Sequence, residues 1–147
     1  MPIQTTYSRY HGQAYEGMVA DQQNANFLSR RATAAIGFGK AVLQGATDDA
    51  CKAVDGSASR FLGVSVRDQS TGADSVNQFK ANDHVRIMDM GTIWVIAGEN
   101  IAAGDRAAYL TASGAFMKAT TSDTTAIDGA RYETTAASGA LVKLKLK

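Results

Sequence analysis

The sequence predicts an all-β fold, a compact β-sandwich or barrel of short antiparallel strands with an extended N-terminal arm. Three observations carry this prediction. From residue 36 onward, apolar and polar residues alternate along several short segments, as expected where the side chains of a half-buried strand switch faces at every residue. Glycine-containing pairs separate these segments and suit tight hairpin turns. No segment keeps a helical period over three turns.

Residues 1–35 differ from the rest of the chain. They are rich in Gln, Asn, Ser, Arg and Ala, contain few aliphatic residues, and sustain neither a helical nor a strand period. We interpret them as an extended arm with long loops, a type of segment that often becomes ordered against a partner. Residues 36–147 form the predicted β domain.

The first strand patterns lie between residues 36 and 67. One places three apolar residues on the same parity: Ile36, Phe38 and Val42. The next is expected to direct Leu62, Val64 and Val66 to one face and Ser65 and Arg67 to the other.

The segment His84 to Ile96 is the strongest predicted strand. Val85 and Ile87 alternate with polar residues, and Gly91 then suggests a turn or bulge. The apolar run from Ile93 to Ile96 suits a strand buried on both faces, which places Trp94 in the core.

Short strands and tight turns are expected in the last third of the chain. Ala107 to Leu110 and Phe116 to Lys118 flank a turn at Ser113-Gly114. Asp128-Gly129 leads into Ala130 to Thr134, and Ser138-Gly139 leads into Leu141 to Leu146. Short strands at regular spacing with such turns are typical of a sandwich or barrel.

The last predicted strand has a charged face and an apolar face. The charged face consists of Lys143, Lys145 and Lys147, and the apolar face of Val142, Leu144 and Leu146. The lysine row could meet phosphates or a carboxylate-rich partner. We favour a solvated face whose lysines discourage edge pairing, because three lysines are too few for useful nucleic-acid affinity.

Composition excludes several classes of protein. The net charge of +1 provides no general attraction to nucleic acid or anionic lipid, and the single cysteine, Cys51, cannot form an intramolecular disulfide. We read Cys51 as a strand or loop residue without chemistry. The first residues lack the pattern of a signal peptide, and no apolar run is long enough to span a bilayer. A soluble chain made in a cytoplasm is therefore expected.

Motifs for catalysis or metal binding are incomplete. His11 and His84 are the two histidines, and the sequence has no Gly-x-Ser-x-Gly elbow and no zinc-ligand spacing. Gly37-Phe38-Gly39-Lys40 lacks the spacing and the Ser/Thr of a phosphate loop, so we assign these glycines to close backbone packing or a strand bend. No cofactor, metal or catalytic residue is predicted.

Five segments, in order along the chain, resemble the bacteriophage structural cement protein family. They are Tyr15-Glu16-Gly17-Met18-Val19-Ala20-Asp21, Ala35-Ile36-Gly37-Phe38-Gly39-Lys40-Ala41-Val42, Phe61-Leu62-Gly63-Val64-Ser65-Val66-Arg67-Asp68, Gly91-Thr92-Ile93-Trp94-Val95 with Ala102-Ala103-Gly104-Asp105, and Ala126-Ile127-Asp128-Gly129-Ala130-Arg131-Tyr132. The resemblance implies a non-enzymatic, largely β protein that forms homo-oligomers, dimers or trimers, on the outside of the phage head. It implies the major capsid protein as partner, with no direct contact to nucleic acid or membrane, and synthesis in the bacterial host cytoplasm.

The N-terminal arm provides the candidate residues for contact with the capsid or with another copy. Tyrosine and arginine are enriched at interface hot spots, and the arm contains Tyr7, Arg9, Tyr10, Tyr15, Arg30 and Arg31. Two alternatives share the β-rich composition: another virion component of the tail, baseplate or head fibre, and a carbohydrate-binding adhesion module.

Overall fold

The computed structural model describes residues 14–69 and 77–147, and in this part every regular element is a strand. The strands are β1 (Val19–Ala32), β2 (Ile36–Gly37), β3 (Ala41–Gln44), β4 (Ala50–Ala53), β5 (Phe61–Ser65), β6 (Gln78–Phe79), β7 (His84–Ile96), β8 (Arg106–Leu110), β9 (Phe116–Lys118), β10 (Thr124–Tyr132) and β11 (Leu141–Leu146). The all-β prediction is confirmed.

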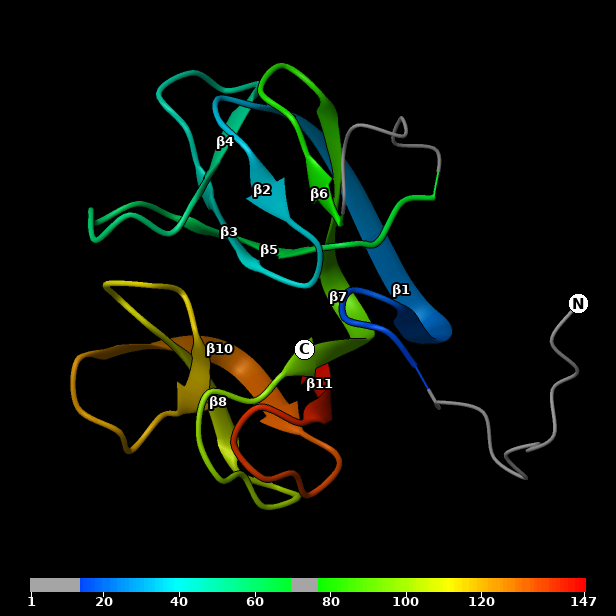
Figure 1. Ribbon diagram of the computed structural model, residues 1–147, viewed down its shortest axis with the longest axis vertical. Helices are drawn as coiled ribbons and strands as arrows, with labels where there is room; N and C mark the ends of the chain where they lie inside the picture. The colour runs from blue at the N-terminus through cyan, green and yellow to red at the C-terminus, as the bar shows by residue number, and fades with distance from the viewer. Residues whose placement is uncertain (1–13, 70–76) are drawn as a thin grey trace, which may run out of the picture.

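The first half of the chain closes into a ring of strands. β1, β4, β3, β5 and β7 pair in that order, and β7 pairs back with β1. These pairings are antiparallel except that of β1 with β4, which is parallel and differs from the antiparallel arrangement expected. We call this closed unit the first ring; it occupies the upper half of the molecule in Figure 1.

The second half closes in the same way and uses β7 again. β7, β11, β10, β8 and β9 pair in that order, and a bridge between Ala97 and Phe116 connects the end of β7 with β9. We call this the second ring, seen in the lower half of Figure 1. The long strand β7 therefore belongs to both rings. Of the two predicted architectures, sandwich and barrel, these closed pairings describe a barrel.

Two groups of buried side chains fill the rings. The first ring contains one group: Ala32, Ile36, Phe38, Val42, Cys51, Leu62, Phe79, Val85 and Ile87. The other group fills the second ring and includes residues from the first ring's strands, among them Leu43, Val64 and Met88. Because neighbouring side chains alternate along a strand, Val42 faces one core and Leu43 the other. The two strand rings thus share a packed boundary. At this boundary the aromatic side chains of Phe61 and Tyr109 stack, with ring centroids 5.5 Å apart.

A two-stranded ribbon of β2 and β6 adds to the first core. Ile36 lies opposite Phe79, and the rings of Phe38 and Phe79 meet edge-on with centroids 5.1 Å apart. The predicted grouping of Ile36, Phe38 and Val42 on one side is confirmed, since all three lie in this core.

Several predicted strands are confirmed with close bounds. β7 matches His84–Ile96 and β11 matches Leu141–Leu146, with Val142, Leu144 and Leu146 buried. β8 and β9 match the pair flanking Gly114. However, β11 lies between β7 and β10, so its lysines do not protect an edge as we had favoured.

Two glycines with turn-like sequence signals lie within strands. β7 runs through Gly91, where the predicted alternative of a bulge is confirmed, and β10 runs through Asp128-Gly129, where a turn was expected. At both places one strand bulges against its neighbour: residues 22–25 of β1 lie opposite Gly91, and residues 127–130 of β10 lie opposite Ala107. A bulge bends a strand without ending it, which is why the sequence signal resembled a turn.

The burial of four side chains differs from the prediction. Trp94 is only half-buried, with the Lys143 ammonium 5.2 Å from its ring centroid, so its assignment to the core is wrong. Ser65 is fully buried although expected to face outward. Leu62 and Val64 lie in different cores, because the pairing shifts between Val42 and Leu43 on the neighbouring strand.

Residues 19–32, which the sequence placed in the N-terminal arm and loops, form β1 of the main sheet. This strand pairs with β7 from Val19 to Arg31. Its buried contacts come from scattered residues such as Ala25, Phe27 and Leu28, interrupted by the bulge, so no regular period marks it in the sequence. Residues 1–13 lie outside the described residues, and the boundary at residue 35 stays a prediction.

Candidate interaction surface

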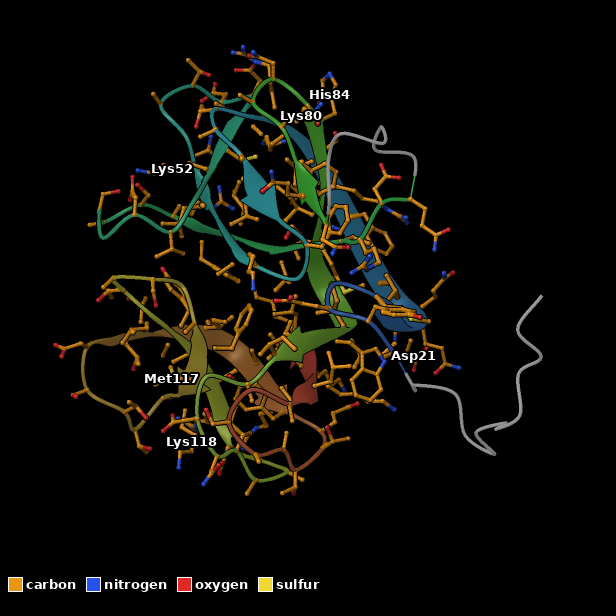
Figure 2. All side chains as sticks on the ribbon, viewed as in Figure 1. Asp21, Lys52, Lys80, His84, Met117 and Lys118 are labelled. Carbon is orange, nitrogen blue, oxygen red and sulfur yellow. The ribbon has the colours of Figure 1, made fainter. Side chains whose placement is uncertain are left out.

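The six candidate interface residues are not gathered at one place. Tyr7, Arg9 and Tyr10 lie outside the described residues. Tyr15 precedes β1, whereas Arg30 and Arg31 lie near the opposite end of that strand. Asp21 and His84 mark these two ends in Figure 2, since Asp21 pairs with Thr92 and Arg31 with His84. The structure brings Arg30 and Arg31 together and separates them from Tyr15.

Tyr15 is the most exposed large hydrophobic side chain of the described residues, with 68% of its surface accessible. The guanidinium of Arg67 lies 5.4 Å from its ring centroid and 5.1 Å from that of Phe38. A cation at this distance from an aromatic face is attracted by the ring quadrupole. Tyr15 is thus oriented by Arg67 while most of its surface stays available.

Residues 15–18 are fixed to the body by main-chain hydrogen bonds. The Gly17 amide donates to the Trp94 carbonyl (2.8 Å), and the Trp94 amide donates to the Met18 carbonyl (2.9 Å). The Arg67 amide donates to the Gly17 carbonyl (2.7 Å). We call residues 15–18 the anchor segment, since they attach the chain that follows the undescribed N-terminal residues to both β7 and the end of β5.

Glycine is required where the anchor segment meets the turn before β3. Gly17 has a φ of 82°, and a Cβ there would lie 2.7 Å from the Gly39 amide nitrogen. Gly39 has a φ of 67°, and its Cβ would lie 2.6 Å from the Gly17 nitrogen. The assignment of Gly39 to close backbone packing is therefore confirmed. Two side chains reinforce the contact, since Lys40 forms an ion pair with Glu16.

Arg67 joins the anchor segment to a second stretch of chain. Its Nε donates to the Glu16 carbonyl (3.1 Å), and a terminal nitrogen donates to the Asn77 side-chain oxygen (2.8 Å). From the sequence, Arg67 was expected only to lie on the outward face of a strand. The signal that could have found this site is that four of the five family-like segments, each containing glycine, contribute to it.

At the far end of β1, the two arginines are partly engaged within the chain. Arg31 approaches Asp49 (3.5 Å between Nε and Oδ2) and donates to the Asn82 side-chain oxygen (3.3 Å). Arg30 donates to the Ser29 carbonyl (3.0 Å), while its buried Nε has no hydrogen-bond partner among the described residues. Arg31 remains exposed, so it can still contact a partner.

β1 also presents a free edge. It pairs with β7 along its length but with β4 only at Arg31 and Ala32. Among the described strands, none covers its other side between residues 19 and 30. Met18 and Met90 nearby are 43% and 38% exposed. A strand edge of this type can accept a further strand through main-chain hydrogen bonds.

The described residues show no concentration of reactive groups. No cluster of three or more His, Cys, Asp or Glu that could hold a metal ion occurs among residues 14–69 and 77–147. Cys51 is buried in β4, and burial raises the pKa of its thiol to about 11, so the thiol stays protonated near neutral pH. Within the same residues, no helix is long and apolar enough to cross a membrane.

Comparison with known proteins identifies a family whose model matches this sequence. A family model described as "Structural cement protein (E217 gp24/Pam3 gp6)" matches residues 3–147. A search of curated proteins finds no match. Among solved structures, the chain is similar to one in the capsid of Myoviridae phage XM1, at 12% identity and a TM-score of 0.79, covering 100% of this chain and 98% of that one.

A second structural likeness is weaker. It is to the head fibre gp8.5 N base of bacteriophage phi29, at 17% identity and a TM-score of 0.53, covering 84% of this chain and 94% of that one. At these identities both structures show a shared fold alone.

Proposed function

The chain belongs to the phage structural cement protein family, and we propose that it performs this capsid role on the outer surface of the head, by bridging neighbouring major capsid proteins. A cement protein associates with the capsid lattice, where the same weak contact repeats many times. Multivalent attachment of this kind gains strength without any single strong site.

The observation that carries the proposal is the anchor segment. Three main-chain hydrogen bonds and the two close glycines fix residues 15–18 to the body. Residues 1–13, with Tyr7, Arg9 and Tyr10, precede this fixed segment in the sequence, and Tyr15 at its start is exposed. A contact made by this segment transmits force directly to both rings. We assign capsid contact to the N-terminal segment and Tyr15, with Arg30, Arg31 and the free edge of β1 as a second contact region.

Further parts of the proposal follow from the family. The protein acts without catalysis, as a homo-oligomer of two or three copies, and binds neither nucleic acid nor membrane. It is made in the cytoplasm of the bacterial host and joins the head there. Light scattering of the purified chain measures the oligomer, and antibody labelling of intact particles tests the outer location against a tail or baseplate position.

The central experiment removes residues 1–13 and keeps the anchor segment. We expect the truncated chain to bind undecorated heads at least about tenfold more weakly, because the tyrosine and arginine contacts are lost. Its thermal midpoint should stay close to that of the intact chain, since every described strand is retained. Binding is measured by co-sedimentation with heads.

A control variant keeps the full chain and replaces Lys118, in β9 of the second ring, by Gln. Lys118 lies away from Asp21 and His84, which mark the two ends of β1 in Figure 2. The control should bind heads as the intact chain does. Equal head binding by the truncated and intact chains would overturn the assignment of capsid contact to residues 1–13.

A further inference from the structure

A row of side chains runs across five adjacent strands of the main sheet. Cross-strand pairing aligns Asp21 with Thr92, Thr92 with Lys145, Lys145 with Arg131, and Arg131 with Arg106. Directly paired residues share one face of a sheet. The row therefore presents three neighbouring cations, Lys145, Arg131 and Arg106, on β11, β10 and β8, and all three are exposed. We call these three residues the basic row.

The basic row is not neutralised within the described chain. No carboxylate oxygen of residues 14–69 or 77–147 lies within 4.0 Å of its side-chain nitrogens, since the ion pairs found there involve Arg31, Lys40 and Lys52. Like charges directly opposite each other on paired strands are destabilising. Three in succession on a protein with a net charge of only +1 are a local concentration of charge that the fold itself does not use.

Each end of the basic row adjoins a hollow formed by a bulge. At the Arg106 end, the bulge of β10 leaves a hollow of about 300 Å³ lined by Arg106, Asp128 and Arg131 among others. At the Lys145 end, the bulge of β1 leaves one of about 230 Å³ lined by Asp21, Glu133 and Lys145 among others. Arg131 donates to the Gly104 carbonyl (3.1 Å), which fixes its guanidinium before any partner arrives and lowers the entropic cost of binding.

We propose that the basic row is a docking site for an acidic segment of a neighbouring shell protein, with carboxylate side chains paired to Arg106, Arg131 and Lys145. Arginine presents a planar fork that matches a carboxylate through two parallel hydrogen bonds. Adjacent strands are about 4.8 Å apart, so the row spans about 10 Å, the length of a few extended residues. This inference rests on the proposed function, which supplies a protein lattice as the partner.

The surroundings of the basic row favour a short acidic peptide over nucleic acid. Along the row, strand pairing places Asp21 beyond Lys145, two strands away. A long polyanion that continued past Lys145 in this direction would meet the Asp21 carboxylate and be repelled. A segment with two or three carboxylates ends before reaching it. Three cations also contribute little to nucleic-acid affinity, which depends on many phosphate contacts.

The test replaces the basic row by Arg106→Gln, Arg131→Gln and Lys145→Gln in the full chain and measures binding to undecorated heads at several salt concentrations. We expect roughly tenfold weaker binding at low salt, because the charge pairs between the basic row and the partner's carboxylates are lost. The dependence of binding on salt should be shallower, because fewer charge pairs remain for salt ions to screen. The thermal midpoint should be unchanged or higher, since repulsion between like charges is removed. A purely structural role of the three residues predicts the opposite shift in stability.

The matched control removes the same charge from the first ring by Lys52→Gln, Lys80→Gln and Arg86→Gln. It should bind heads within about twofold of the intact chain, because exposed charge contacts such as that of Lys52 with Asp55 contribute little. A short DNA duplex added as competitor should not displace the intact chain from heads.

Two outcomes would overturn the inference: unchanged head binding by the basic-row variant, or displacement of the intact chain by the duplex. If the intact chain itself failed to bind heads, the proposed function would fall and the inference with it, so the two failures are distinguishable.

Discussion

Ser65 shows how one buried side chain fixes a corner of the first ring. Its hydroxyl donates to the Gly37 carbonyl (2.6 Å) and accepts from the Lys40 amide (3.0 Å). The Gly39 amide donates to the Ser65 carbonyl (2.8 Å). The short turn from β2 to β3 is thus tied to β5 through one residue, and this turn is the one that contacts the anchor segment.

Replacing Ser65 by Ala should lower the free energy of unfolding by about 1–3 kcal/mol, because the Lys40 amide loses its acceptor and the Gly37 carbonyl loses its donor beside a fully buried position. Urea denaturation followed by circular dichroism measures the change. The exposed Ser29 provides a control, for which Ser29→Ala should change stability by less than about 0.5 kcal/mol. A Ser65→Ala variant as stable as the control would show that solvent replaces the lost bond.

Cys51 makes stability depend on pH in the alkaline range. Burial raises the pKa of its thiol from 9.0 to about 11. Above pH 9 the unfolded state releases the proton while the folded state retains it, so the unfolded state binds fewer protons and stability falls as pH rises. The contribution is complete below pH 9 and is lost as pH approaches about 11.

The free energy of unfolding of the intact chain should therefore decrease between pH 9 and 11 by on the order of 2 kcal/mol more than that of a Cys51→Ala variant. Comparing slopes with the variant removes the contributions of lysines and tyrosines, which titrate in both proteins. Parallel slopes would show that the thiolate forms without penalty in the folded state.

At the scale of the strands, the close approach of β5 to β7 depends on Gly63. A Cβ at this position would lie 2.1 Å from the Met88 carbonyl oxygen. That oxygen belongs to the backbone of the strand shared by both rings, so it cannot move without disturbing both. The irregular pairing here is also what separates Leu62 from Val64 between the two cores.

We expect Gly63→Ala to destabilise the fold by about 3 kcal/mol or more, through steric overlap of the added Cβ with the backbone of β7. Gly139→Ala is the matched control: its φ is 83°, but nothing lies within 4 Å of the added Cβ. The control should cost only about 1 kcal/mol, the strain of a left-handed residue. Thermal unfolding of both variants measures the difference, and equal losses would point to backbone strain in place of overlap.

The strands that could be predicted from the sequence are those with an undisturbed period of two. β7 and β11 were located with their bounds because each keeps one face buried along most of its length. β1 was missed because the bulge at residues 22–25 interrupts its alternation, and the parallel closure by β4 depends on contacts far apart in the chain.

The candidate site was predictable only in part. Tyr15 was identified from its residue type, and its exposure agrees with a contact role. The contribution of Arg67 could not be foreseen, because its partners Glu16, Phe38 and Asn77 are separated in sequence. Lys145 was considered for a carboxylate-rich partner as part of the lysine row, but only the register of three strands places Arg131 and Arg106 beside it.

At the scale of the whole molecule, the two rings are expected to unfold together. They share β7, and Leu43, Val64 and Met88 of the first ring are buried in the second core. Separating the rings would expose these side chains to water at about 25 cal/mol for each Å². The second core is therefore incomplete without the strands of the first ring.

The chain contains one tryptophan and one cysteine, which report on different regions: Trp94 packs on β11 of the second ring, and Cys51 lies in the first core. Trp94 fluorescence and labelling of the Cys51 thiol should give the same denaturant midpoint, as for a two-state transition. Two separate midpoints would show that the rings unfold independently.

The free edge of β1 has a consequence for the subunit before assembly. Because both rings are closed, the described strands have few unpaired edges to which a strand of another copy could hydrogen-bond. The exposed stretch of β1 is bent by its bulge and carries polar residues, Asp21, Gln22, Gln23 and Asn24. Bends and polar side chains at a strand edge hinder continued edge-to-edge pairing of strands from different copies. The bend and the polar side chains therefore limit how many further strands can add to this edge.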